Sequence, residues 1–134
     1  MTRLPTSKQL LVDTQILIWA ALGEGLTPNT KKILEETDEL FVSSISILEI
    51  KIKQAVNKLA YFDVSDQVNQ LNAVVLDYSA DHAEKYRIFN PKNRDPFDNA
   101  IIATALAETI DLLSSDLSIL DTPIKGVRTI NARQ

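Results

Sequence analysis

The chain has 134 residues, 45% of them hydrophobic, and a formal net charge of −4. This length and apolar content predict one folded domain over residues 1–134. The sequence has no cysteine and a single histidine, His82, which excludes a disulfide framework, a thiol nucleophile and a zinc site built from Cys or His clusters. No segment approaches the roughly 18 apolar residues of a membrane span and no signal peptide is evident, so we expect a cytoplasmic protein with no membrane partner.

The acidic balance, with an isoelectric point of about 4.9, argues against a nucleic-acid-binding protein, because affinity for phosphate normally comes from Lys and Arg. Bound cations or a basic partner would remove this conflict. Acidic residues that gather in one pocket can form a binding site, whereas acidic residues spread over the surface only add to the net charge. The positions of the acidic residues therefore decide whether the negative charge excludes binding to nucleic acid.

Apolar runs and helical periodicities divide the whole chain into alternating elements. The predicted elements in chain order are a strand at 9–12, a helix after Asp13, a helix from Thr27 to about Glu36, a strand at 40–43, a helix at 44–59, a loop with a short helix within 61–71, a strand at 74–76, a helix at 79–89, a helix from Asp95, a strand at 111–114 and an edge strand at 127–130. Strands that alternate with helices predict a three-layer α/β/α fold with a mainly parallel central sheet. Ligands of such folds bind at the carboxyl ends of the strands, where Asp13 and Asp116 each follow a predicted strand.

The most informative segment is RDPFDNAIIATALA at residues 94–107. Asp95 is a favoured N-cap and Pro96 suits the first helical position, so a helix begins here. Asp98 lies three residues after Asp95, which puts both carboxylates on the first turn. Acids are common there because they interact with exposed amides, but the apolar helix that follows indicates an interior element whose acids open onto a packed site. The loop at 90–94 must fold back for these acids to reach the strand that ends before Asp116.

Four acids stand out from this pattern, with Asp95 as a fifth candidate: Asp13, Glu49, Asp98 and Asp116. A few carboxylates can bind Mg²⁺ while the ion keeps several waters, and the ion offsets their mutual repulsion. Metal-bound water provides a nucleophile without His or Cys. Each acid also has a simpler role, since Asp13 and Asp116 could cap the helices that follow them and Glu49 could pair with Lys53 at i, i+4.

Four blocks, LVDTQILIW at 11–19, SISILEIKIK at 44–53, RDPFD at 94–98 and SSD at 114–116, resemble the ordered motifs of the PIN domain family. More narrowly they resemble the VapC-type toxins of bacterial type II toxin–antitoxin pairs. The resemblance extends from Leu10 to about Ile130 and implies an α/β/α endoribonuclease that uses Mg²⁺ or Mn²⁺. By matching position, the catalytic acids would be Asp13, Glu49, Asp98 and Asp116, the metal ligands Asp13, Asp98 and Asp116, and the supporting residues Thr14, Asp95 and Ser114.

The same resemblance implies an RNA substrate, a cognate antitoxin that lays a basic segment across the acidic site, and a homodimer. We expect the apolar surface of the early helices, including Trp19, Ile52 and Val56, to bind the antitoxin or a second copy of the chain. The alternative is that these residues belong to the core, which fits Ile52 better than Trp19. Two positions depart from the family pattern. Leu48 replaces a tryptophan, which affects packing, and Asn99 replaces an arginine, which weakens the expected contact with RNA.

Two other interpretations remain open. A phosphoryl-accepting receiver domain is also a small acidic α/β domain, but Val12 stands where it needs a second acid, and no lysine follows the strand that ends at Ser114. The stronger alternative is a catalytically silent PIN-like module that only binds a partner. The presence of all four main acids argues against it.

Overall fold

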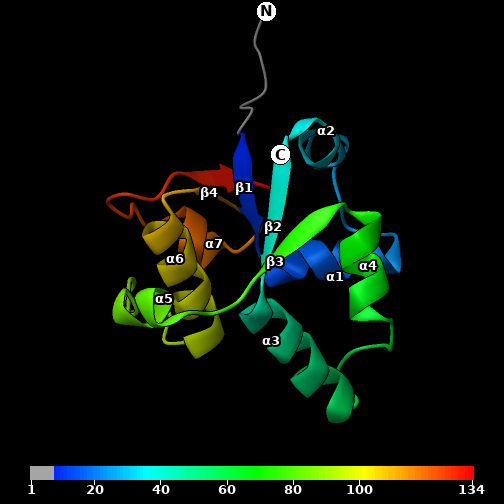
Figure 1. Ribbon diagram of the computed structural model, residues 1–134, viewed down its shortest axis with the longest axis horizontal. Coiled ribbons are helices and arrows are strands. Elements are labelled where there is room, and N and C mark those ends of the chain that lie inside the picture. The colour runs from blue at the N-terminus through cyan, green and yellow to red at the C-terminus, as the bar shows by residue number, and fades with distance from the viewer. Residues whose placement is uncertain (1–7) are drawn as a thin grey trace, which may run out of the picture.

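The computed structural model describes residues 8–134, in which five parallel strands lie between helices on both faces (Figure 1). The elements are β1 (Gln9–Val12), α1 (Thr14–Leu22), α2 (Pro28–Glu36), β2 (Glu39–Ser43), α3 (Ser44–Ala55), α4 (Val64–Gln70), β3 (Ala73–Leu76), α5 (Ala80–Glu84), α6 (Pro96–Glu108), β4 (Asp111–Ser114), α7 (Leu117–Leu120) and β5 (Thr129–Asn131). The predicted α/β/α architecture is confirmed. No helix among these residues is long and apolar enough to cross a membrane.

The strand order is β3-β2-β1-β4-β5, with β1 in the middle. The chain first builds the sheet from β1 towards β3 and then returns to the other side of β1 to add β4 and β5. The order therefore reverses between β1 and β4. In parallel sheets this switch point opens a crevice at the carboxyl ends of the two strands, and Asp13 and Asp116 both lie there.

Residues of the central strands alternate between two cores because successive side chains of a strand point to opposite faces. Leu10 and Val12 of β1 pack with α1, α3 and α4, whereas Leu11 packs with α6 on the other face. Helix α6 is buried from Asn99 to Ala105, as expected for an interior helix. Its first turn is less buried than expected, because Asp95 and Pro96 are exposed and Asp98 is half-buried.

Three predicted boundaries are wrong. Helix α3 ends at Ala55 instead of residue 59, because Val56 forms the C-cap and Asn57 adopts a left-handed conformation with φ 56°. The helix predicted at 79–89 is the short α5, because the chain must turn back towards α6, where the side chain of Asn99 binds the backbone of Phe89. The final strand is β5, shifted from 127–130 to the residues that pair with β4.

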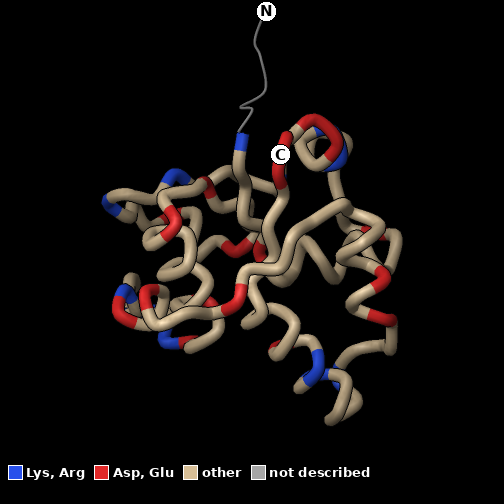
Figure 2. The backbone as a smooth tube through the Cα atoms, viewed as in Figure 1, with Lys and Arg blue, Asp and Glu red and all other residues tan. Residues whose placement is uncertain are grey.

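The charged residues lie mostly on outer helices and loops, but acidic segments also lie in the middle of the molecule beside the sheet (Figure 2). On α3, the predicted apolar stripe is largely on the surface: Leu48, Ile52 and Val56 are 50%, 44% and 56% exposed. Leu48 therefore lies on the surface and not in the core. Periodicity identified an apolar face, and residues 8–134 leave it largely exposed.

Candidate active site

Asp13 joins the central strand to the first helix and is held on both carboxylate oxygens. It is the N-cap of α1, where Oδ1 accepts a hydrogen bond from Thr14 N at 2.8 Å. Its Oδ2 accepts from Ser114 Oγ at 2.7 Å, and the same Ser114 hydroxyl accepts from Asp116 N at 3.0 Å. One hydroxyl at the end of β4 thus ties the acid after β1 to the acid after β4. Asp13 is only 4% exposed.

Glu49 reaches the same edge from α3. Thr14 Oγ1 donates to Ser46 Oγ at 2.8 Å, and both residues are buried, so α1 and α3 are held together one turn before Glu49. Glu49 is 8% exposed, and its Oε2 lies 3.0 Å from Lys53 Nζ. The i, i+4 ion pair considered from the sequence therefore exists, on a glutamate that is buried rather than solvated.

The first turn of α6 supplies two further acids. Asp95 is the predicted N-cap, with Oδ1 accepting from Phe97 N at 2.8 Å and Asp98 N at 3.3 Å. Asp98 Oδ2 accepts from Asn93 Nδ2 at 2.9 Å, and the same amide nitrogen donates to Ser118 Oγ at 2.8 Å. The loop at 90–94 does fold back, and it holds Asp98 towards the strand end.

Asp116 completes the set and also has the capping role considered from the sequence. Its Oδ1 accepts from Ser118 N at 2.8 Å and from Ser118 Oγ at 2.6 Å at the start of α7. Asn93 and Ser118 therefore connect Asp98 to Asp116 through side chains alone. Sequence reasoning missed both residues, because polar residues in a loop and a short helix carry no distinctive spacing.

Asn99 has a structural role that contradicts the expected position at an RNA-binding surface. It is 1% exposed, its Oδ1 accepts from Phe89 N at 3.3 Å, and its Nδ2 donates to the carbonyls of Asn93 and Asp95 at 3.1 Å each. The side chain fastens the 90–94 loop onto α6. The residue thus orients Asp98 indirectly and does not face a ligand.

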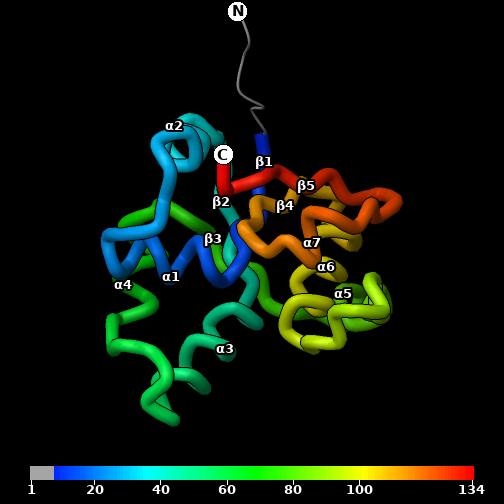
Figure 3. The backbone as a smooth tube through the Cα atoms, turned by 180° about the vertical axis from the view of Figure 1, so that it is seen from behind, coloured from blue at the N-terminus to red at the C-terminus, as the bar shows by residue number. Residues whose placement is uncertain are grey.

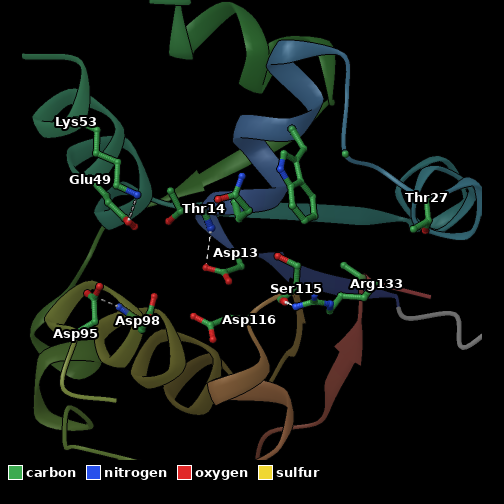
Figure 4. Close-up of a pocket in the computed structure, with 14 residues that line it drawn as sticks. Asp13, Thr14, Thr27, Glu49, Lys53, Asp95, Asp98, Ser115, Asp116 and Arg133 are labelled. Atoms are coloured by element: carbon green, nitrogen blue, oxygen red, sulfur yellow. Dashed lines mark hydrogen bonds and ion pairs between the residues drawn. The ribbon is translucent and has the colours of Figure 1, made fainter. Parts of the chain in front are cut away.

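These acids border one cavity of about 540 Å³ at the switch point between β1 and β4 (Figure 4). Five carboxylates and two cationic side chains line it: Asp13, Glu49, Asp95, Asp98 and Asp116 with Lys53 and Arg133. In Figure 4, Asp13 and Asp116 lie between the Glu49, Lys53 and Asp98 side chains at one end and Arg133 with Thr27 at the other. Thr14 also lines the cavity, whereas Ser114 acts from behind Asp13.

The electrostatics of the cavity favour a bound cation. Burial raises the pKa of Asp13 from 3.8 to about 6, against the hydrogen bonds from Ser114 and Thr14, and the charges of Glu49 and Asp116 raise it further. Burial also raises the pKa of Asp98 to about 7, with added repulsion from Asp13, Asp95 and Asp116. Ionised together at neutral pH, these carboxylates repel one another, and a positive ligand would relieve that repulsion.

The donor set fits a hard divalent cation, since all five acidic groups offer carboxylate oxygens. As the side chains stand in residues 8–134, no three Asp, Glu, His or Cys groups are close enough together to hold a metal ion. A cation in this cavity would therefore bind directly through one or two carboxylates and keep several waters, which is how Mg²⁺ usually binds. Mn²⁺ accepts the same oxygen ligands.

Comparison with known proteins identifies the architecture. The family model for the PIN domain matches residues 10–125, and no curated protein matches the chain. The solved complex of VapBC2 from Rickettsia felis with promoter DNA contains a similar chain, with a TM-score of 0.63, 18% identity and coverage of 92% of this chain and 98% of that one. DNA-bound VapBC from Salmonella typhimurium gives a TM-score of 0.64 and 16% identity over 92% and 97% of the two chains.

The VapBC-5 toxin–antitoxin structure from Mycobacterium tuberculosis gives a TM-score of 0.60 and 17% identity, covering 92% of this chain and 98% of that one. At these identities the similarity establishes a shared fold. The family match excludes the receiver-domain interpretation.

Proposed function

Because the chain belongs to the PIN domain family, we propose that it is an endoribonuclease that depends on Mg²⁺ or Mn²⁺. The observation that carries this proposal is the cavity at the β1–β4 switch point, which five carboxylates line and in which the buried Asp13 feels the charges of Glu49 and Asp116. A cluster of this kind destabilises a fold unless it binds something positive. It contains no His or Cys that could replace a metal in hydrolysis.

In this proposal Asp13, Asp98 and Asp116 hold the cation, one or two of them directly and the others through the waters that Mg²⁺ keeps, and Glu49 is the fourth catalytic acid. A divalent cation bound here would supply a water of lowered pKa and would offset the charge that develops on the phosphate. Asp13 is fixed for this role by Ser114 and by the amide of Thr14. Asp98 and Asp116 each have one carboxylate oxygen without a hydrogen bond from residues 8–134, which leaves that oxygen available to a ligand. Asp95 supports the set by capping α6.

We further propose that the chain is the toxin of a type II toxin–antitoxin pair. Similar chains occur in VapBC complexes and in FitAcB from Neisseria gonorrhoeae. The acidic cavity would attract a basic segment of an antitoxin, because arginine pairs with carboxylates and can substitute for the charge of a cation. The exposed apolar face of α3, formed by Leu48, Ile52 and Val56, offers a docking surface for the antitoxin or for a second copy in a homodimer.

The test is cleavage of RNA by the purified chain with Mg²⁺ or Mn²⁺ and with excess EDTA. Activity should require the cation and should fall at least roughly 100-fold in Asp116→Asn, whose side chain can still cap α7. Asp121→Asn is the matched control, since Asp121 is an exposed aspartate that does not line the cavity. Undiminished cleavage in EDTA, or equal activity of the two variants, would refute the nuclease proposal.

A catalytically silent interaction module would bind the antitoxin yet cleave no RNA with any cation. Co-expression with the product of a neighbouring small gene, followed by co-purification and the cleavage assay, separates the two functions. Light scattering on the chain alone, compared with an Ile52→Asp and Val56→Asp double variant, tests whether a second copy covers α3. A partner that neither co-purifies nor lowers cleavage would contradict the toxin proposal and leave the nuclease proposal intact.

A further inference from the structure

The residues that follow β5 are held to the rest of the fold by hydrogen bonds, although Arg133 and Gln134 are exposed to solvent. Ala132 is buried, its N–H donates to the Ser114 carbonyl at 2.9 Å, and its carbonyl accepts from Thr30 Oγ1 at 3.0 Å. Thr27 Oγ1 donates to the Gln134 carbonyl at 2.6 Å. These bonds join residues 132–134 to the start of α2 and to the end of β4. Figure 3 shows the red C-terminal end of the chain close to α2.

This segment carries the Arg133 side chain into the acidic cavity. The Arg133 backbone N–H donates to Asn131 Oδ1 at 2.8 Å, and its Nη1 donates to the Ser115 carbonyl at 3.2 Å. Ser115 lies between Ser114, which holds Asp13, and Asp116. The guanidinium is therefore attached to the same turn that positions the central acids (Figure 4).

Most donors of this guanidinium are unused. A guanidinium has five N–H donors, and the Ser115 carbonyl accepts from one of its nitrogens. No carboxylate of residues 8–134 forms an ion pair with Arg133, although five carboxylates line the same cavity. The other cationic group, Lys53, does pair with Glu49. Arg133 thus presents a charged planar fork at one end of the cavity with no acidic partner from the described chain.

The lining of the cavity suits a nucleotide. Trp19, Gly25 and Thr27 line the cavity together with Arg133. Gly25 has φ +98°, and a Cβ there would lie 2.6 Å from the Trp19 ring, so the glycine packs directly against the indole. The cavity thus has both an aromatic ring and a cation in its lining, which is the composition with which proteins hold a nucleotide of a single strand.

We propose that Arg133 binds the phosphate next to the scissile one in a single-stranded RNA substrate, as a positioning residue for the ribonuclease activity proposed above, on which this inference rests. The planar fork of arginine matches two phosphate oxygens, which lysine cannot do. The acids would hold the cation that the scissile phosphate needs, and Arg133 fixes the adjacent nucleotide. Arg133 thereby gives this acidic protein a cationic group that can bind an RNA phosphate within the acidic cavity.

The experiment measures KM and kcat for cleavage of a mixed-sequence single-stranded RNA oligonucleotide by the wild type, Arg133→Gln, Arg133→Lys and Lys125→Gln. Lys125 is an exposed cation that does not line the cavity, so Lys125→Gln removes the same charge elsewhere. Arg133→Gln should raise KM roughly 10- to 100-fold with a much smaller change in kcat, since a charge-assisted hydrogen bond is lost. Arg133→Lys should recover part of the loss, and Lys125→Gln should behave as wild type.

A second readout does not depend on turnover. In an Asp98→Asn background, binding of the same RNA with Mg²⁺ present is measured against salt concentration with and without Arg133→Gln. The logarithm of the binding constant falls as the logarithm of the salt concentration rises. Loss of one phosphate contact should make this negative slope shallower by about 0.7. Melting temperatures of all variants establish that they are folded.

An unchanged KM with an unchanged salt slope overturns the assignment and leaves Arg133 as an internal counter-charge for the acids. A fall in kcat at constant KM also overturns it, because Arg133 would then act at the reacting phosphate itself. If the wild type cleaves no RNA with any cation, the proposed function fails. The salt-dependence measurement still decides whether Arg133 binds phosphate.

Discussion

Replacing Asp98 by Asn removes one negative charge from the cavity while keeping the shape of the side chain. The side-chain oxygen of the introduced asparagine can still accept the hydrogen bond that Asn93 Nδ2 donates at 2.9 Å to Asp98 Oδ2 in the wild type. Burial, with repulsion from Asp13, Asp95 and Asp116, raises the pKa of Asp98 to about 7. The folded, cation-free protein therefore binds more protons than the unfolded chain between about pH 4 and pH 7. Its stability falls as pH rises through this window.

The size of the effect follows from the pKa. A carboxyl pKa raised from 3.8 to about 7 corresponds to roughly 4 kcal/mol of destabilisation well above pH 7. Asp98 is partly exposed to solvent, which screens the charges, so we expect roughly 1–2 kcal/mol. In EDTA at pH 8, Asp98→Asn should be more stable than wild type by this amount, which is roughly 3–10 °C in Tm for a domain of this size. Near pH 4 the difference should vanish.

Urea unfolding and thermal melting in EDTA at pH 4, 6 and 8 measure this difference. Asp63→Asn is the matched control, because Asp63 is the exposed N-cap of α4 outside the cavity and Asn caps equally well. Added Mg²⁺ should stabilise the wild type more than Asp98→Asn. If Asp98→Asn were no more stable than the control at pH 8 in EDTA, the cavity would not hold mutually repelling charges, and the reasoning for a cation would fail.

Three further outcomes follow from the same contacts. Mn²⁺ should raise the melting temperature strongly at pH 8 and weakly at pH 5 in a thermal-shift titration. Asp13 and Asp98, with pKa values of about 6 and about 7, must lose their protons before they can bind the ion. Equal stabilisation at both pH values would contradict this prediction. Ser114→Ala should lower the free energy of unfolding in urea by roughly 1–3 kcal/mol. It should also shift the rise of the pH–rate profile to higher pH, because Asp13 loses the hydrogen bond that lowers its pKa. An unmoved pH–rate profile would contradict this role of Ser114. Asn99→Ala should cost roughly 2–4 kcal/mol by releasing the 90–94 loop, and an unchanged unfolding midpoint would show that this amide does not fasten the loop.

The sequence predicts the fold well because its signals are local. The N-cap and proline at Asp95 and Pro96 define the start of α6, and short apolar runs define the buried strands. The grouping of Asp13 with Asp116 follows from strand ends in a parallel sheet. The same local signals fail at residues 79–89, because the chain there is held by Asn99, a residue that follows it in the sequence and binds Phe89.

Other features depend on tertiary pairing and have no local signature. Arg133 reaches the cavity only because β5 pairs with β4 and Ala132 continues that register onto Ser114. Asn93 and Ser118 connect Asp98 to Asp116 across 25 residues of sequence. The periodicity of α3 correctly identifies an apolar face, but periodicity reports only that such a face exists and not whether the core or a partner covers it.

The central claim is that the acidic cavity binds a divalent cation and hydrolyses RNA with it. The most direct test titrates Mg²⁺ into EDTA-stripped protein while RNA cleavage and the melting temperature are followed on the same sample. We predict that cleavage is absent at the start and that both signals rise together with one midpoint. Full cleavage before any cation is added, or stabilisation by Mg²⁺ without cleavage, would contradict the claim.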